Sequence, residues 1–326
     1  MKKHVTKILW LITVIMFVAV PITYAAEVVL YSSNPSELQD MIRVDFEKQT
    51  GIKVSAVKMG TGSAMKRIQA EKDNPLCDVF WSGDVAVLDG AKDYFMSYKS
   101  AEAAALPAGY VEKDYRWTSS NAHVMIIMYN KSLVSEAEKP QAWKDIFAPQ
   151  WKGKVVMANP AKSGSAYAQT YGLYKLYGWD GLNKLIANAK ILDSSSLIYK
   201  GVAGGEYPVG ITMEYAAYRY IAGGSKDVGI VYPSDGAFVA PEGAAIIKNC
   251  PHPEEAKKFF DYLIRKSTEE KIFENFYRRP ARPDTADFAG LPKISEITVM
   301  KDFDPIEANA IKKDLLTKWK EIILSK

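Results

Sequence analysis

Short apolar runs alternate with amphipathic stretches along most of the chain. Residues 27–31 are mainly apolar, which is typical of a short buried strand, whereas residues 36–49 repeat apolar side chains at the spacing of one helix face. The same order returns at residues 52–57 and 64–72. Strands that alternate with helices in this way predict a mainly parallel sheet covered by helices.

The rest of the chain continues both patterns. Further strands are predicted at 78–81, 123–130, 154–158, 209–213, 228–232 and 243–248, and further helices at 166–177, 182–190, 198–203, 253–265, 268–276 and 314–324. Two of these strands, 123–130 and 243–248, are suited to crossing between domains. A chain of this length favours two closely joined domains over one.

Four polar turns follow predicted strands, and three of them precede predicted helices. They contain Ser33 and Asn34; Thr61, Gly62 and Ser63; Ser82, Gly83 and Asp84; and Ser163, Gly164 and Ser165. The start of a helix presents free backbone N–H groups, and serine hydroxyls and glycine allow an anion to approach them. Ligands of parallel sheets bind beyond the carboxyl ends of the strands, where these turns lie. The turns therefore predict an anion site, although each could simply cap its helix.

The first 25 residues have the pattern of a secretory signal peptide. A basic segment, residues 1–7, precedes an apolar run, residues 8–20, and small residues then offer a cleavage site near Ala25. The apolar run is short for a membrane span, so an uncleaved anchor is the weaker alternative. No cysteine follows to carry a lipid. We therefore expect an exported protein located in the periplasm.

Removal of this segment changes the charge of the protein. The formal net charge is +4, and three lysines of the signal account for three of these charges, so 4 − 3 leaves about +1. A nearly neutral protein gives no reason to expect nucleic acid or an anionic membrane as partner.

Sequence signatures of hydrolytic enzymes are absent. There is no Gly-x-Ser-x-Gly and no His-Glu-x-x-His, and the glycine-rich turn at 60–63 lacks the Lys-Ser/Thr ending of a nucleotide P-loop. The histidines, His4, His123 and His252, do not form a metal-binding spacing. We therefore do not expect an enzyme, and no motif indicates a cofactor. An exported hydrolase that uses paired carboxylates is the alternative.

An ordered set of short motifs resembles the periplasmic solute-binding proteins of ABC importers. The motifs are Tyr31-Ser32-Ser33, the join from Phe46 to Val54, Gly60-Thr61-Gly62-Ser63, Asp78-Val79-Phe80-Trp81-Ser82-Gly83, Trp151-Lys152-Gly153-Lys154, Asn159-Pro160 with Ser163-Gly164, and Gly205-Glu206-Tyr207-Pro208-Val209-Gly210-Ile211. They cover nearly the whole mature chain in the family's order. The branch that they resemble includes binders of ferric ion, hexose phosphate and aminoethylphosphonate.

The resemblance implies a type 2 periplasmic-binding-protein fold. Two α/β lobes, each a mostly parallel sheet flanked by helices, would enclose a cleft, with two crossing strands as the hinge. Lobe 1 would contain residues 26–121 and 238–295, and lobe 2 residues 122–237 and 296–326. The expected function is that of a monomer that captures a small anionic ligand and delivers it to the ABC permease in the membrane.

The serine-rich turns and the resemblance together favour a phosphorylated organic anion, either a hexose phosphate or a phosphonate. The resemblance adds a turn with Ser195 and Ser196 and the strand-end residues Glu214 and Tyr215. The predicted ligand-binding residues are Ser33, Asn34, Thr61, Gly62, Ser63, Ser82, Gly83, Asp84, Ser163, Gly164, Ser165, Ser195, Ser196, Glu214 and Tyr215. Asp84, Glu214 or Glu242 would suit sugar hydroxyls or an amino group.

Ferric ion is the alternative cargo that the resemblance implies. The family's ferric binders hold the metal with two adjacent tyrosines, and here Tyr215 matches one while Ala216 replaces the other. Loss of one phenolate weakens a site for a hard cation. If iron binds, Tyr215 and Tyr218 are its predicted ligands.

Basic residues are densest at Arg278, Arg279 and Arg282. An arginine of this cluster could bind a phosphate in bidentate fashion. A structural salt bridge or a solvated turn is the more ordinary interpretation.

Cys77 and Cys250 are the two cysteines of the chain. In the fold implied by the resemblance they lie at the same end of neighbouring strands, and an exported protein meets an oxidising compartment. We expect a disulfide between them. Two free buried thiols are the alternative.

Overall fold

The computed structural model describes residues 26–287 and 290–325. Within them the strands are β1 (Glu27–Ser32), β2 (Lys53–Lys58), β3 (Val79–Asp84), β4 (Thr118–Asn130), β5 (Val155–Ala158), β6 (Ala189–Leu192), β7 (Val209–Met213), β8 (Val228–Val231) and β9 (Phe238–Ile246). The helices are α1 (Ser36–Thr50), α2 (Thr61–Ala70), α3 (Val85–Asp89), α4 (Gly164–Asn188), α5 (Ser195–Ala203), α6 (Glu214–Ala222), α7 (Pro253–Ile264), α8 (Lys266–Phe276) and α9 (Pro305–Leu324).

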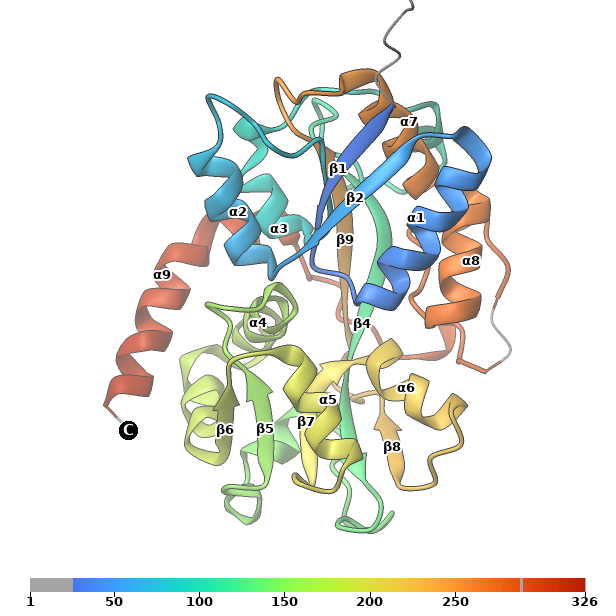
Figure 1. The fold of residues 1–326 in the computed structure, drawn as a ribbon. Coiled ribbons are helices and arrows are strands. Elements are labelled where there is room, and N and C mark those ends of the chain that lie inside the picture. The colour runs from blue at the N-terminus through green and yellow to red at the C-terminus, as the bar shows by residue number, and fades with distance from the viewer. Residues whose placement is uncertain (1–25, 288–289, 326) are drawn as a thin grey trace, which may run out of the picture.

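The chain forms two α/β lobes, as predicted (Figure 1). One sheet continues through both in the order β2-β1-β3-β9-β4-β7-β5-β6, with β8 beside β4. In lobe 1, β1 is parallel to β2 and β3, and in lobe 2, β5 is parallel to β6 and β7. The long antiparallel strands β4 and β9 pass from one lobe to the other. The residue boundaries at 121/122, 237/238 and 295/296 remain predictions.

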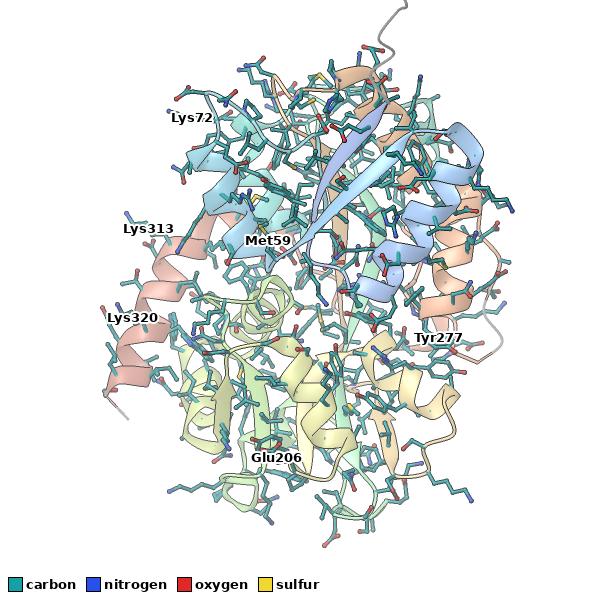
Figure 2. All side chains as sticks on the ribbon, in the orientation of Figure 1. Met59, Lys72, Glu206, Tyr277, Lys313 and Lys320 are labelled. Atoms are coloured by element: carbon teal, nitrogen blue, oxygen red, sulfur yellow. The ribbon has the colours of Figure 1, made fainter. Side chains whose placement is uncertain are left out.

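The C-terminal helix α9 extends along the side of the molecule, from lobe 1 down past lobe 2 (Figure 1). It packs against α3 of lobe 1 and α4 of lobe 2. Its outer face carries Lys313 and Lys320, which point away from the body of the molecule (Figure 2). The helix therefore contacts both lobes away from the crossing strands.

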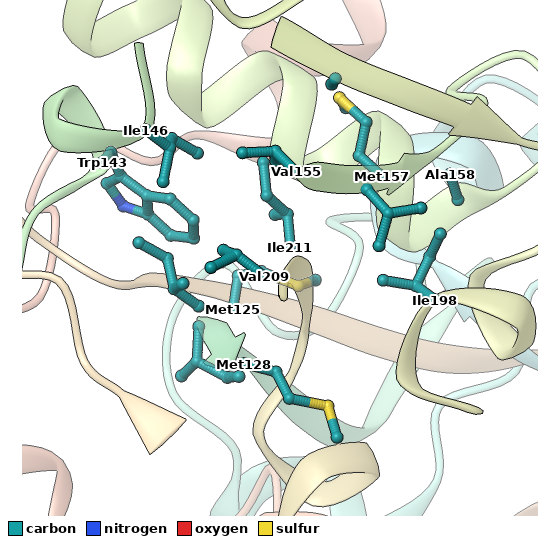
Figure 3. Packing of buried hydrophobic residues seen from close by; sticks show 14 of the residues in the cluster. Met125, Met128, Trp143, Ile146, Val155, Met157, Ala158, Ile198, Val209 and Ile211 are labelled. Carbon is teal, nitrogen blue, oxygen red and sulfur yellow. The ribbon is translucent and has the colours of Figure 1, made fainter. Parts of the chain in front are cut away.

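Each lobe has its own hydrophobic core. The core of lobe 1 contains Val28, Leu30, Val79 and Phe80. The core of lobe 2 contains residues of β4, β5 and β7 (Figure 3). Strands β3, β5 and β7 are buried along their whole length. Continuous apolar runs are the expected pattern for parallel strands covered on both faces.

Two irregularities interrupt the sheet where β9 crosses between the lobes. The register of β3 on β9 shifts between Trp81 and Gly83, and that of β4 on β9 shifts between Ser119 and Asn121. Ser82, inside the first shift, has a φ of 74°. β-Bulges redirect side chains and occur often at functional sites, and these two lie opposite neighbouring residues of β9, the first between Gly243 and Ala244 and the second between Glu242 and Gly243.

Several predicted elements differ from those observed. Helix α9 begins at Pro305, because Asp304 caps it by accepting a hydrogen bond from the N–H of Ile306, so the predicted start at 314 is wrong. The predicted helices 166–177 and 182–190 join into α4 across a kink at Gly178 (φ 60°, ψ −161°), and residues 189–192 form β6. Helices α2 and α5 begin earlier than predicted, inside the turns at Thr61 and Ser195.

The expected disulfide is also wrong, since Cys77 and Cys250 are free and buried. The register that pairs Val79 with Ile246 places Cys77 opposite Lys248, whereas Cys250 lies two residues further on, in a turn. The thiol of Cys77 instead contacts the carbonyl oxygen of Val79 at 3.2 Å.

No helix in the described part of the chain is long and apolar enough to cross a membrane. The predicted signal peptide, residues 1–25, lies outside the described residues.

Candidate functional site

The starts of five helices face the region between the lobes. Helices α1 and α2 follow the carboxyl ends of β1 and β2 in lobe 1, and α4, α5 and α6 follow those of β5, β6 and β7 in lobe 2 (Figure 1). Each helix start presents backbone N–H groups without intrahelical partners. This arrangement is able to stabilise negative charge between the lobes.

The lobes touch directly at the first residue of α4. A Cβ atom on Gly164 would lie 3.3 Å from Asp84 Cβ and 3.7 Å from Thr61 Oγ1. A Cβ atom on Gly62 would lie 3.9 Å from the carbonyl oxygen of Ala161. We call this contact, formed by residues 60–62 and 84 with residues 161–165, the interlobe junction.

Hydroxyl groups join the predicted turns around this junction. Thr61 Oγ1 donates to Ser33 Oγ at 3.3 Å, and Ser33 Oγ donates to the carbonyl oxygen of Ser82. Across the junction Ser163 caps α4 by accepting from the N–H of Ala166 at 3.3 Å. The structure thus brings the four predicted turns together.

The remaining predicted serines lie in the first turns of α2, α4 and α5. Ser165 Oγ lies 3.1 Å from Ser163 Oγ, and Ser196 Oγ lies 2.9 Å from Ser194 Oγ, the cap of α5. Ser195 is the first residue of α5, and Ser63 is exposed in the first turn of α2. Their contact with a ligand stays a prediction.

Asn34 is a fully buried amide without a partner. Its side chain has no exposed surface, yet neither Nδ2 nor Oδ1 has a hydrogen bond to any part of the chain that the structure describes. Buried polar atoms of native proteins are almost always paired. Asn34, just after the carboxyl end of β1, therefore holds two N–H donors and a carbonyl acceptor that the described chain leaves unused.

Asp84 ends β3 and caps α3 by accepting from the N–H of Ala86 at 3.0 Å. Its carboxyl group is buried. Burial raises the pKa of Asp84 to about 7, with Lys312 opposing the rise and Glu242 adding to it. Asp84 can therefore carry a proton near neutral pH and act as either donor or acceptor.

A second polar cluster lies where β9 crosses between the lobes. Arg278, 3% exposed, places Nη1 3.0 Å from Glu242 Oε2 and 3.2 Å from His123 Nε2, while its Nη2 donates to Tyr215 Oη at 2.9 Å. Its guanidinium also lies over the ring of Tyr215, 4.3 Å from the centroid. One arginine thus binds a residue of each lobe, and we call this set the Arg278 cluster.

The two irregular strands supply further partners to this cluster. Ser82 Oγ donates to Glu242 Oε2 at 2.9 Å, and Asn121 Nδ2 donates to the same oxygen at 3.3 Å. Burial alone would raise the pKa of Glu242, but His123 and Arg278 outweigh it and lower this pKa to about 2. Burial lowers the pKa of His123. Burial raises the pKa of Tyr215 to about 12.

Glu214 belongs to a neighbouring buried ion pair. Arg279 Nε and Nη2 each lie 2.7 Å from one of its carboxylate oxygens, and Tyr232 Oη donates to Oε1 at 2.6 Å. The backbone of Arg279 pairs with Ala122 of β4. Both oxygens of Glu214 are engaged, so the ion pair alone explains the position of this carboxylate.

The arginine-rich segment is therefore buried, and its interpretation as a solvated turn is wrong. Arg282 lies 3.0 Å from Asp284 and also pairs with Glu102. Buried Glu269 accepts the backbone N–H groups of Ala281 at 2.7 Å and Arg282 at 3.0 Å. These anchors position the two preceding arginines.

Several other residues near the site have structural roles. Tyr31 and Trp81, which belong to the motifs that resemble the family, are buried in the core of lobe 1. Tyr218 packs edge-on against Tyr277, with 4.9 Å between ring centroids. Gly83 has no room for a side chain, because a Cβ atom would lie 2.6 Å from the ring of Phe80.

Sequence reasoning missed His123 and Asn121 as members of the Arg278 cluster. The available signal was the run of polar residues from Thr118 to Asn121 at the start of a long apolar strand, all of which are buried. For Arg278 the sequence offered a phosphate ligand, a solvated turn or a structural salt bridge, and the structure shows the salt bridge, to Glu242. Its role in joining β9, β4 and α6 depends on contacts between distant segments.

Comparison with known proteins identifies the family. The family described as bacterial extracellular solute-binding protein matches residues 74–302. Among curated relatives, Iron uptake protein A1 of Synechocystis sp. is 24% identical over 299 residues, 85% of this chain and 80% of its own length. A putative 2-aminoethylphosphonate-binding periplasmic protein of Salmonella typhimurium is 23% identical over 258 residues, 73% of this chain and 72% of its own length.

A solved structure supports the fold. The periplasmic binding protein AfuA from Actinobacillus pleuropneumoniae, with exogenous fructose-6-phosphate bound, superposes with a TM-score of 0.86 at 22% identity, covering 92% of this chain and 99% of AfuA. The matched family is one of solute-binding proteins, not of enzymes. The chain therefore belongs to the bacterial extracellular solute-binding proteins, the substrate-binding components of ABC importers.

Proposed function

We propose that this protein captures a small phosphorylated organic anion, a hexose phosphate or a phosphonate, between its two lobes in the periplasm and delivers it to an ABC permease. The anionic group would lie at the interlobe junction, against the start of α4. Ser163, Gly164 and Ser165 would meet it from lobe 2, and Ser33 and Thr61 from lobe 1. Asp84 and Asn34 would accept and donate hydrogen bonds to the rest of the ligand.

The observation that carries this proposal is the position of Arg278. Tyr215, His123 and Glu242 offer the oxygen and nitrogen atoms that a ferric ion would need, and the guanidinium of Arg278 already lies among them. An arginine side chain keeps its positive charge at every physiological pH. A ferric ion at this place would be repelled, whereas Glu242 already compensates the charge of Arg278, so the anionic group of the ligand is assigned to the interlobe junction.

Ferric ion remains the competing cargo, because several curated relatives are named for iron uptake or for ferric-iron binding. Tyr215 and Tyr218 would then be the ligands. One observation disfavours this reading: Tyr218 packs edge-on against Tyr277.

A thermal-shift screen of the mature protein tests the proposal. The panel contains glucose 6-phosphate, fructose 6-phosphate, 2-aminoethylphosphonate, inorganic phosphate and ferric citrate, with glucose and fructose as uncharged controls. A true ligand at a hundred times its Kd adds about 2.7 kcal/mol to the free energy of unfolding and raises Tm by several degrees.

We expect a shift with at least one organic phosphate or phosphonate and none with the free sugars. A shift with ferric citrate alone, together with the colour of a tyrosinate-to-iron charge transfer, would overturn the proposal in favour of iron.

A further inference from the structure

The C-terminal helix carries a lysine on its inner face. Ala308, Lys312 and Leu315 are four and three residues apart, so they share one side of α9. Ala308 and Leu315 pack in a small cluster with Ala86 of α3 and with Tyr167 and Tyr171 of α4. Lys312 is half-buried between them, with its Nζ over the ring of Tyr167 at 5.1 Å from the centroid.

This lysine lies beside the interlobe junction. Tyr167 is in the first turn of α4, three residues after Gly164, and donates its hydroxyl hydrogen to the carbonyl oxygen of Ala308. Asp84 caps α3 and contacts the same helix start, because a Cβ atom on Gly164 would lie 3.3 Å from its own Cβ. Helix α9 thus brings a positive charge to the place where α2, α3 and α4 meet.

The ammonium group of Lys312 has no ion pair or hydrogen bond within 4 Å among the residues that the structure describes. Other lysines nearby are paired: Lys175 lies 2.8 Å from Glu307, and Lys162, in the turn before α4, lies 2.7 Å from Asp193. Burial lowers the pKa of Lys312, and Asp84 opposes this change. A partly buried ammonium without a paired anion is unfavourable, so an anion that arrives beside it is strongly stabilised.

We propose that Lys312 is a ligand-binding residue that, with the start of α4 and with Asp84, completes the subsite for the anionic group of the ligand. This inference rests on the function proposed above and names a residue for it. A lysine ammonium acts as a compact point charge with three donors, which suits a phosphate or phosphonate oxygen. Closure of the lobes over the ligand would then involve the C-terminal helix as well as the two α/β lobes.

Isothermal titration calorimetry with fructose 6-phosphate and 2-aminoethylphosphonate tests the assignment on the mature protein. The variants are Lys312→Met, which removes the charge, and Lys312→Arg, which keeps it. The matched control is Lys313→Met, because Lys313 is the next residue of α9 but is exposed and points outward (Figure 2). Thermal unfolding without ligand checks that each variant is folded.

We expect Lys312→Met to raise the Kd of the probe that binds wild type at least tenfold, Lys312→Arg to raise it less than Lys312→Met does, and Lys313→Met to change it less than twofold. The Kd of wild type should also rise with salt more steeply than that of Lys312→Met. If wild type binds a probe and Lys312→Met binds it equally well, the assignment of Lys312 is wrong while the proposed function stands. If wild type binds neither probe, the proposed function fails, and the assignment with it.

Discussion

The Arg278 cluster with its neighbouring ion pair and the interlobe junction are both polar, but they differ in how their groups are satisfied. In the first region, Glu242 accepts hydrogen bonds from Ser82, Asn121 and Arg278. Both carboxylate oxygens of Glu214 accept hydrogen bonds from Arg279. In the second, none of the residues that the structure describes pairs with the side-chain amide of Asn34 or forms an ion pair with the ammonium of Lys312.

This difference suggests a structural role for the first region and a ligand-binding role for the second. A saturated network of buried charges is rigid, and removing one member leaves another buried charge without compensation. Groups that lack protein partners keep their capacity for a ligand. We infer that the saturated region holds the lobes in register, whereas the junction supplies the binding energy.

Breaking the saturated region should have the largest effect. Glu214→Gln removes the charge that compensates Arg279, and both side chains are nearly fully buried. We expect the free energy of unfolding, measured with urea, to fall by about 3 kcal/mol. Glu206→Gln is the control, because Glu206 is exposed at the end of lobe 2 away from the junction (Figure 2) and should change stability by less than about 0.5 kcal/mol. Equal stabilities of the two variants would refute a structural role for Glu214.

Titration of Asp84 should give the next largest effect. Its pKa is about 7 when folded and near 3.8 otherwise, so between these values the folded state binds more protons and stability falls as pH rises. Asp84→Asn removes this dependence. Relative to wild type, the variant should gain about 2 kcal/mol between pH 5 and pH 7 in urea unfolding.

Glu242→Gln sharpens the contrast, since the pKa of Glu242 is lowered to about 2. Its stabilising contribution is present above about pH 4.5 and is lost as pH falls towards 2. Relative to wild type, the stability of Asp84→Asn should therefore rise with increasing pH, whereas that of Glu242→Gln should rise with decreasing pH. If both differences changed in the same direction with pH, the assigned environments would be wrong.

Closing the space at the junction should affect binding more than stability. Gly164→Ala places a Cβ atom 3.3 Å from Asp84 Cβ, and one lobe must shift to admit it. We expect the Kd for the best organic phosphate, measured by calorimetry, to rise about fivefold, or about 1 kcal/mol. Gly62→Ala meets only an ordinary contact, at 3.9 Å from Ala161, and should bind nearly as wild type does. If Gly62→Ala raised the Kd more than Gly164→Ala did, close packing at the start of α4 would be ruled out.

The smallest effect is expected from the cysteines, which lie far from both regions at the other end of β3. Because Cys77 and Cys250 are free, a reducing agent should leave Tm unchanged within about a degree, whereas loss of a disulfide would cost about 2–5 kcal/mol. Titration of the unfolded, unreduced protein should find two thiols per chain.

The sequence by itself determined the class of fold and the four polar turns. The mainly apolar runs at 27–31, 154–158 and 209–213 correspond to β1, β5 and β7, of which β5 and β7 are buried along their whole length, as expected for apolar strands covered on both faces. The turns could be predicted for a similar reason: a local run of serine and glycine before a helix has few alternatives to a cap or an anion site.

Only the tertiary structure decided which charges meet. Arg278, Glu242, His123 and Tyr215 come from four separate segments, and the bulges at Ser82 and Ser120, which redirect neighbouring side chains, leave no periodic signal. Lys312 is similar, since it is one of several lysines in α9 and only the packing of this helix on α3 and α4 distinguishes it from Lys313. The free thiols of Cys77 and Cys250 likewise depend on a register offset of two residues. Periodicity reports the face that an element buries, whereas contacts between distant segments depend on how all the elements pack together.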